Sequence, residues 1–215
     1  MLKGKTLVLC TALAMITILL VMFPSIFPGS RSYGFARAVS SQEEANRLAL
    51  VETACQWLGC RESNGTHKSI IDLYNAHEPL ARDYAVKYTD QWCAAFGSAA
   101  AIACKITDII PTECGCEKQI ILFQSLGRFV EDDSYLPLPG DYIFFSSRDS
   151  GEGDCTEWSD HVGIVVGTSG SYIKVIEGNN NRAVRYRYIK ADSKSIRGYG
   201  VPDYASIVTE KPQGK

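Results

Sequence analysis

Histidine is scarce in this sequence, and an excess of positive charge is missing. His67 and His77 fall in the helical half of the chain, where we expect them on the surface. The 22 Lys and Arg are outnumbered by 24 Asp and Glu, which gives a net charge of −2 at pH 7. Nucleic-acid-binding proteins usually carry the opposite balance, so we expect no nucleic-acid partner.

Internal repeats and an interdomain linker are also missing, and the 215 residues therefore predict one sizeable core with appendages.

The first 38 residues contain no acidic side chain and do not look like part of that core. Lys3 and Lys5 precede an uncharged apolar run over residues 7–23, which is followed by a spacer rich in Pro, Gly, Ser and Arg. Such a run is typical of a signal peptide or of a single membrane anchor, and either one would export the rest of the chain. The A-x-A motif ends at Ala38, far beyond the run, and this distance favours an uncleaved anchor that attaches the protein to the membrane.

Residues 39–215 are acidic as a whole, because the other 18 Lys and Arg face all 24 acidic residues there. Residues 180–197 are a local exception, with six Lys or Arg and one acid, Asp192. Two interpretations stay open. Either a strand turns its tyrosines inward and its arginines to water, or the segment is a docking face for an anionic surface such as a bacterial wall.

Eight cysteines are present, and in an exported domain they suggest disulfides. Cys10 lies in the apolar run, and we expect Cys93 to stay free. The remaining six predict at least one disulfide, although their pairing is open. A structural zinc site stays an alternative, but the C-x-C spacing near residue 115 is too short for the usual zinc knuckle, and no cofactor is expected. The six are Cys55, Cys60, Cys104, Cys114, Cys116 and Cys155.

Helical patterns fill the first half of this region, and strand patterns fill the second. Ser41 with Glu44 forms a capping box, and apolar residues recur at helical spacing until Gly59. Helices followed by strands predict an α+β domain with an antiparallel sheet. Three further helices are predicted over residues 69–77, 92–104 and 117–130. Short β-rich segments lie at residues 142–145, 161–168, 172–179, 183–189 and 196–201.

The stretch TDQWCAAFGSAA, residues 89–100, places Cys93 at the predicted start of a helix with small residues on one face. A thiol is a strong nucleophile only when it is ionised, and the positive end of a helix favours the thiolate. The backbone N–H of Cys93 is also free there to face an oxyanion. Cys93 is therefore the candidate nucleophile, and core packing is the structural alternative. Gln91 is a candidate second oxyanion donor, and Trp92 is expected to be a groove wall or a core aromatic.

The remaining histidine, His161, opens a predicted strand and has a carboxylate within reach. A three-residue hairpin loop at residues 168–170 sets His161 opposite Glu177 when the pairs are counted outwards from the turn. Asn179 lies on the same face of the second strand, because side chains alternate along a strand. A carboxylate and an amide beside an imidazole fix its tautomer and stabilise its charged form. A register slip of one residue would separate these groups.

Four short motifs occur in a fixed order along the chain: WCAAF at 92–96, PGDYIFF at 139–145, DHVGIVV at 160–166 and IEGN at 176–179. Together they resemble the CHAP family (cysteine, histidine-dependent amidohydrolase/peptidase) of papain-like bacterial cell-wall hydrolases. The resemblance covers roughly residues 45–204. It implies peptidoglycan as the partner, with Cys93 as nucleophile, His161 as general base and later acid, Glu177 as orienting acid and Asn179 as a supporting polar residue.

The resemblance also implies a papain-like α+β fold, in which N-terminal helices pack on a C-terminal antiparallel sheet. The domain organisation is then a signal peptide or anchor with its spacer at residues 1–38, a catalytic domain at 39–205 and a tail at 206–215. The acidic insertion at residues 148–160 departs from the family pattern. It contains no recognised calcium loop, so the calcium requirement of some relatives is not assumed.

The expected activity is thiol-dependent cleavage of an amide in peptidoglycan, either muramoyl–alanine or peptide–peptide, on the outer face of the cell membrane or in the cell wall. One alternative is a wall-binding or scaffold module that has the fold without turnover. The other is a thiol amidase or acyltransferase for a small exported substrate. The presence of Cys93, His161 and Glu177 together favours an enzyme, and an open groove would favour the polymeric substrate.

Overall fold

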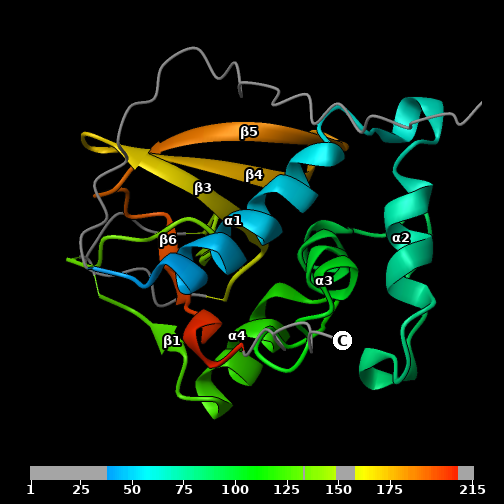
Figure 1. Ribbon diagram of the computed structural model, residues 1–215. Coiled ribbons are helices and arrows are strands. Elements are labelled where there is room, and N and C mark those ends of the chain that lie inside the picture. The colour runs from blue at the N-terminus through cyan, green and yellow to red at the C-terminus, as the bar shows by residue number, and fades with distance from the viewer. Residues whose placement is uncertain (1–37, 133, 149–157, 208–215) are drawn as a thin grey trace, which may run out of the picture. The chain divides into compact units, whose positions relative to one another are not determined.

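The computed structural model describes residues 38–132, 134–148 and 158–207 (Figure 1). Contacts divide the chain into residues 1–32 and 33–215, and every described residue belongs to the second unit. The predicted apolar run, Cys10, Cys155, most of the acidic insertion and most of the predicted tail lie outside the described residues. Within the described part, none of the helices combines the length and the apolar character needed to cross a membrane.

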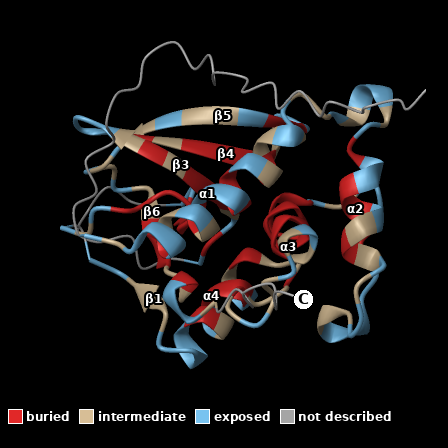
Figure 2. Cartoon of the chain, in the orientation of Figure 1, coloured by how far each residue is buried: buried red, intermediate tan, exposed pale blue. Residues whose placement is uncertain are grey.

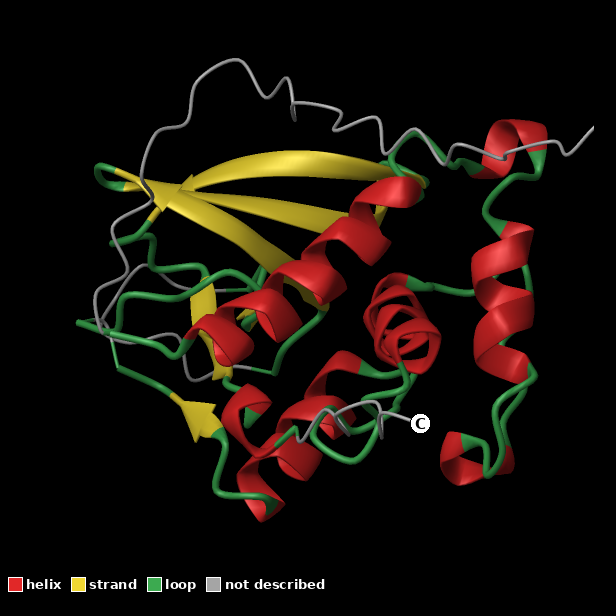
Figure 3. Cartoon of the chain, viewed as in Figure 1, coloured by secondary structure: helices red, strands yellow, loops and turns green. Residues whose placement is uncertain are grey.

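The described residues form four α-helices, in the order that the sequence predicts (Figure 3). The first begins one residue earlier than expected, because the Ser40 hydroxyl accepts a hydrogen bond from the Glu43 N–H at 3.0 Å. The last is shorter than predicted, because the chain turns at Gly127 with a φ of 64° and then joins the sheet. The helices are α1 (Ser41–Gln56), α2 (Lys68–Asn75), α3 (Cys93–Cys104) and α4 (Cys116–Ser125).

The strands of the described region form one antiparallel sheet of six strands, in the order β1-β6-β2-β3-β4-β5. The predicted α+β architecture is therefore confirmed. The short strand β1 was not anticipated, because its residues had been assigned to the last helix. The strands are β1 (Phe129–Val130), β2 (Tyr142–Phe145), β3 (His161–Ser169), β4 (Tyr172–Asn180), β5 (Ala183–Lys190) and β6 (Ile196–Gly200).

Helix α3 is almost entirely buried, and it lies directly against the sheet (Figure 2). Two glycines make this approach possible. A Cβ on Gly97 would lie 2.7 Å from the Tyr142 ring, and a Cβ on Gly178 in β4 would lie 2.3 Å from Phe96 Cβ. The Tyr142 hydroxyl also donates to the Gly97 carbonyl at 2.7 Å. The predicted small-residue face of this helix therefore fixes its start beside the ends of β3 and β4.

A buried ion pair joins α1 to the turn before β2. The Arg47 guanidinium, 1% exposed, donates to Asp141 at 2.8 Å, to Glu43 at 2.9 Å and to the Pro139 carbonyl at 3.1 Å. Removing one member would leave a buried charge without its partner, which is costly. The PGD part of the second motif is therefore structural here, since it attaches the first helix to the sheet.

Candidate active site

Cys93 is the first residue of α3, as the sequence predicts, and its side chain is 4% exposed. The residue before it, Trp92, has non-helical dihedral angles and a fully buried ring, whose Nε1 donates to Glu62 at 3.1 Å. The residue before the thiol is therefore held in place by its burial and its hydrogen bond. The first N–H groups of the helix have no partner within it, and their positive field favours a thiolate at this position.

A second thiol lies against the first. The Sγ atoms of Cys93 and Cys116 are 3.5 Å apart, and Cys116 is the first residue of α4, so two helix starts converge here. The hydrogen bond from Cys116, together with the one from His161, outweighs burial and lowers the pKa of Cys93 well below its usual range. The same contact and burial raise the pKa of Cys116. These opposite pKa shifts favour a Cys93 thiolate that accepts from a Cys116 thiol.

His161 is the first residue of β3, and its imidazole is the basic group that interacts with Cys93. Its Nε2 lies 3.3 Å from Oε2 of Glu177, so Nδ1 is the nitrogen left for the thiol. Burial alone would lower the pKa of His161, but the interactions with Cys93 and Glu177 raise it to about 9. Its ring stacks on Phe145, which lies directly opposite in β2, with ring centroids 6.1 Å apart. The arrangement therefore favours a thiolate on Cys93 and an imidazolium on His161.

The β3–β4 register differs from the predicted one, but His161 and Glu177 still lie on the same face of the sheet. The hairpin turn is two residues long, with Ser169 opposite Tyr172, and a bulge lies between Val165 and Gly167. Ile164 then opposes Ile176, so His161 and Glu177 are diagonal neighbours and not directly opposite. The predicted pairing was wrong by two residues. A shift of two preserves the face on which each side chain lies, and the two groups still meet.

Gly163 provides the space for this diagonal contact, and sequence reasoning missed it. A Cβ at Gly163 would lie 2.8 Å from Glu177 Cγ, 2.5 Å from Val175 Cγ1 and 3.0 Å from the Ile176 carbonyl oxygen. Real Cβ atoms do not approach so closely. The glycine in the DHVGIVV motif therefore lets the Glu177 side chain cross the strand towards His161. The only available signal was a glycine inside an otherwise β-branched strand.

Glu177 is completely buried and has two further partners. Its Oε1 lies 2.7 Å from Nε of Arg187, and its Oε2 accepts from Nδ2 of Asn180 at 2.5 Å. The amide that contacts Glu177 is therefore that of Asn180, the residue after the predicted Asn179. Asn179 has a φ of 58° at a bulge in β4, and its Nδ2 donates to Gln91 Oε1 at 2.6 Å. The bulge turns the two asparagines in different directions, which the sequence pattern did not show.

The segment that enters β3 is attached to the start of α4. Glu117, the residue after Cys116, accepts from the Ser159 N–H at 2.9 Å. The Ser159 hydroxyl donates in turn to the Phe145 carbonyl at 3.0 Å. Because Ser159 precedes His161 by two residues, this chain of bonds positions both the second thiol and the histidine. None of these contacts is visible in the sequence, since they join segments far apart along the chain.

The six described cysteines are all free, so the expected disulfide is not formed among them. Two of the sulfur atoms outside the site lie close to hydroxyl groups. Cys55 lies 3.3 Å from the Tyr186 hydroxyl, and Cys104 donates to the Thr53 hydroxyl at 3.2 Å. Across the described ranges, no group of three or more His, Cys, Asp or Glu side chains could hold a metal ion.

A small hollow of about 230 Å³ lies next to the segment that leads into α3. It is lined by Asp90 and Gln91 from that segment and by Cys114, together with Arg82 and Tyr84. Arg82 contacts the Glu113 carboxylate at 2.7 Å, and the Tyr84 hydroxyl donates to Asp90 at 2.7 Å. The surface beside Asp90 and Gln91 is therefore recessed and polar.

Comparisons with known proteins find little. No family model matches the chain, and no curated protein matches it. Among solved structures, an NlpC/P60 family protein from Bacillus cereus ATCC 10987 aligns with 72% of this chain at 16% identity and a TM-score of 0.40. The protein Ly7917 aligns with 74% of it at 14% identity and a TM-score of 0.44.

The aligned regions cover 39% and 62% of those two chains, so this chain spans less than two thirds of either. Likenesses this weak establish neither a family nor an activity. The CHAP similarity of the motifs therefore stays a resemblance, and the chemistry of the site is inferred from its own geometry.

Proposed function

We propose that the protein is an exported, papain-like thiol hydrolase that cleaves an amide bond in peptidoglycan. The observation that carries the proposal is the convergence of three groups. Cys93 lies at a helix start, His161 interacts with it, and the buried Glu177 lies 3.3 Å from the far nitrogen of the imidazole. A thiolate, a proton carrier and a group that orients the carrier are the components of nucleophilic amide hydrolysis.

The reaction begins with attack of the Cys93 thiolate on the amide carbonyl. The negative oxygen of the tetrahedral intermediate is stabilised by the Cys93 N–H at the start of α3. Gln91 supplies a second donor, since its Oε1 already accepts from Asn179 and its Nε2 is left for the oxyanion. His161 then protonates the amide nitrogen, the C–N bond breaks, and the amine leaves a thioester on Cys93. The neutral His161 next takes a proton from a water molecule, whose oxygen attacks the thioester carbonyl and breaks the C–S bond. This step releases the carboxylic acid and restores the Cys93 thiolate beside the protonated His161.

Cys116 keeps the nucleophile ionised in this scheme. Its thiol donates to the Cys93 sulfur, whereas a second thiolate at 3.5 Å would repel it. Glu177 orients His161 and stabilises its charged form, and Arg187 and Asn180 hold the carboxylate in turn. The preformed ion pair is therefore maintained by groups from two helices and two strands.

The cellular setting follows from the N-terminal sequence and is part of the proposal. An uncleaved apolar run at residues 7–23 would hold the catalytic domain on the outer face of the membrane, close to the wall. N-terminal sequencing of protein from the native host tests this point. A chain that begins at Val39 and is found in the medium would mean a secreted enzyme instead.

Digestion of purified sacculi by the full-length protein tests the activity. We expect wild type to release fragments whose masses identify the bond that is cut, and Cys93→Ser to release none. Cys104→Ser is the matched control, because Cys104 lies at the other end of the same helix and should be dispensable. Cys93→Ala and His161→Ala should each reduce turnover by several orders of magnitude, and the double variant should lose little more. Additive losses would mean that the two side chains do not act as one unit.

A further inference from the structure

Cys93 and Cys116 are two free thiols whose sulfur atoms lie 3.5 Å apart. They are 23 positions apart in the sequence, and each is the first residue of its helix, so the pair joins α3 to α4. The sulfur atoms of a disulfide are about 2 Å apart, and the two thiols are therefore about 1.5 Å from bonding distance. Rotation of the two side chains is enough for a movement of this size.

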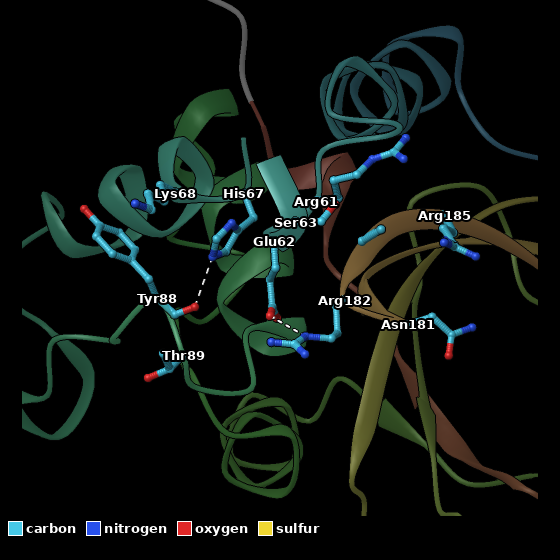
Figure 4. Close-up of a pocket in the computed structure, with 11 residues that line it drawn as sticks. Arg61, Glu62, Ser63, His67, Lys68, Tyr88, Thr89, Asn181, Arg182 and Arg185 are labelled. Carbon is cyan, nitrogen blue, oxygen red and sulfur yellow. Dashed lines mark hydrogen bonds and ion pairs between the residues drawn. The ribbon is translucent and has the colours of Figure 1, made fainter. Parts of the chain in front are cut away.

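The start of α3 is held by a buried tryptophan. The Trp92 indole donates to Glu62 at 3.1 Å, and Glu62 also accepts from Arg182 at 2.6 Å (Figure 4). His67, which was expected on the surface, is 3% exposed because its ring packs against Trp92. Its Nε2 lies 3.0 Å from the Tyr88 carbonyl oxygen (Figure 4). These contacts keep the next residue in the chain, the nucleophile, in place.

The start of α4 is held as well, and its neighbouring cysteine has another partner. Glu117 accepts from the Ser159 N–H at 2.9 Å. Cys114, two residues before Cys116, accepts a hydrogen bond from Arg82 at 3.0 Å, and burial raises the pKa of the Cys114 thiol. Cys116 is therefore the thiol that contacts the nucleophile, and Cys114 is a close comparison for it.

We propose that Cys93 and Cys116 are a site of reversible oxidation, at which a peroxide converts the two thiols to a disulfide. This disulfide differs from the one expected from the sequence, which left Cys93 free. The site itself rests on the positions of the two sulfur atoms, whereas its effect on turnover rests on the proposed function. A sulfur atom in a disulfide does not attack an amide, so the oxidised protein is inactive until a dithiol reduces it.

The first step uses the same property that makes Cys93 a nucleophile. The hydrogen bond from Cys116 lowers the pKa of Cys93, and thiolates are the form of cysteine that reacts with peroxides. The thiolate attacks one oxygen of hydrogen peroxide, an S–O bond forms and the O–O bond breaks. The sulfur is oxidised by two electrons to a sulfenic acid. The other oxygen leaves as hydroxide and becomes water by taking a proton from His161.

Cys116 completes the reaction without a second oxidant. The hydrogen bond that it donates to Cys93, together with burial, raises its pKa, because a thiolate disfavours a second thiolate beside it. A sulfenic acid is uncharged, so oxidation of Cys93 makes Cys116 easier to ionise. The Cys116 sulfur then attacks the Cys93 sulfur, the S–S bond forms and the S–O bond breaks. Hydroxide leaves and combines with the Cys116 proton to form water.

The neighbouring thiol also determines whether the oxidation is reversible. A sulfenic acid that meets no thiol reacts with a second peroxide and becomes a sulfinic acid, which a dithiol does not reduce. Formation of the disulfide ends this sequence one step earlier. Cys116 therefore protects the nucleophile from permanent loss.

Treatment of the full-length protein with hydrogen peroxide tests the proposal. Each protein is treated until Cys93 no longer reacts with iodoacetamide, since Cys116→Ala also changes the pKa of Cys93. Peptide mapping of wild type should then show Cys93 linked to Cys116, with a mass lower by two hydrogen atoms. Dithiothreitol should restore nearly complete alkylation of Cys93 in wild type. In Cys116→Ala, Cys93 should be a sulfinic acid and alkylation should stay lost.

Cys114→Ser is the matched control, because it removes a thiol from the same Cys-Gly-Cys segment, and it should form the link and recover as wild type does. Equal recovery of Cys93 in wild type and in Cys116→Ala would overturn the proposal. A link from Cys93 to any other cysteine would also overturn it, and this includes Cys10 and Cys155, which lie outside the described residues.

The proposed hydrolysis is tested separately, by digestion of sacculi with the reduced wild type. A Cys93–Cys116 link in a protein that does not digest sacculi would retain the oxidation site and reject the enzyme. Digestion that peroxide abolishes and dithiothreitol does not restore would retain the enzyme and reject reversible oxidation. If both hold, digestion should be lost and regained in step with the link.

Discussion

Replacing Gly163 by alanine should displace Glu177 from His161. The new Cβ would meet Glu177 Cγ at 2.8 Å, Val175 Cγ1 at 2.5 Å and the Ile176 carbonyl at 3.0 Å. The backbone carbonyl belongs to the strand ladder and cannot retreat without breaking it. The Glu177 side chain is therefore the group that must move, and its 3.3 Å contact with the imidazole should be lost.

The change in folding free energy caused by Gly163→Ala follows from two opposing effects. Overpacking in a well-packed region costs about 1–3 kcal/mol of folding free energy. Alanine recovers about 0.5–1 kcal/mol, because glycine loses more backbone freedom on folding. A net loss of about 1–2 kcal/mol should leave the protein folded. Displacement of an orienting group by about 1 Å can cost about 100-fold in turnover, so activity should fall much further than stability.

Gly200→Ala is the matched control, because its Cβ would lie 2.6 Å from the Phe123 ring and far from the histidine. Urea denaturation should show similar destabilisation for both variants. Alkylation of Cys93 by iodoacetamide, followed against pH, and digestion of sacculi should be altered only by Gly163→Ala. If the two variants lose turnover equally, or if Gly163→Ala retains wild-type turnover, the idea that Gly163 admits Glu177 to the site is refuted.

Three further outcomes are expected. Although burial opposes it, the interactions with Cys93 and Glu177 raise the pKa of His161 to about 9, so turnover should fall as the pH rises through about 9 while alkylation of Cys93 persists; a fall near the ordinary histidine pKa would contradict this. Cys116→Ala should raise the pKa of Cys93, because it removes the donated hydrogen bond. Slower alkylation of Cys93 at low pH would reveal this change. The control Cys104→Ala should leave the rate of alkylation unchanged. Glu177→Gln should fold but turn over more slowly, since an amide orients the imidazole without stabilising its charge; unchanged rates at every pH would remove Glu177 from the mechanism.

Short-range patterns in the sequence predicted the helical first half, the antiparallel second half and the helix that begins at Cys93. They were sufficient because helix starts and strand alternation depend on residues within a few positions of one another. The alanines and glycine after Cys93 predicted close packing on the sheet, and Gly97 against Tyr142 confirms it. The burial of His67 was missed, because it depends on Trp92, which lies 25 positions later in the sequence.

The arrangement around the thiol depended on contacts between distant segments, which only the tertiary structure determines. Cys116 looked like a candidate for a disulfide until the start of α4 was seen to meet the start of α3. Cys-Gly-Cys in a sequence does not indicate which other thiol lies nearby. The same holds for the Glu117 contact that attaches the segment before β3, since the two partners are 42 positions apart.

The β3–β4 hairpin shows most clearly what local sequence determines and what tertiary packing determines. The sequence determined that His161 and Glu177 lie on adjacent strands, because both strands and the turn between them are local features. Near the turn, however, Gly167 opposes Lys174. If this register continued unchanged along the two strands, Glu177 would lie on the face of the sheet away from His161. The bulge beside Val165 shifts the pairing by one residue and returns Glu177 to the correct face. Side chains alternate with a period of two, so this one-residue irregularity, which is set by packing, decided whether the carboxylate meets the imidazole.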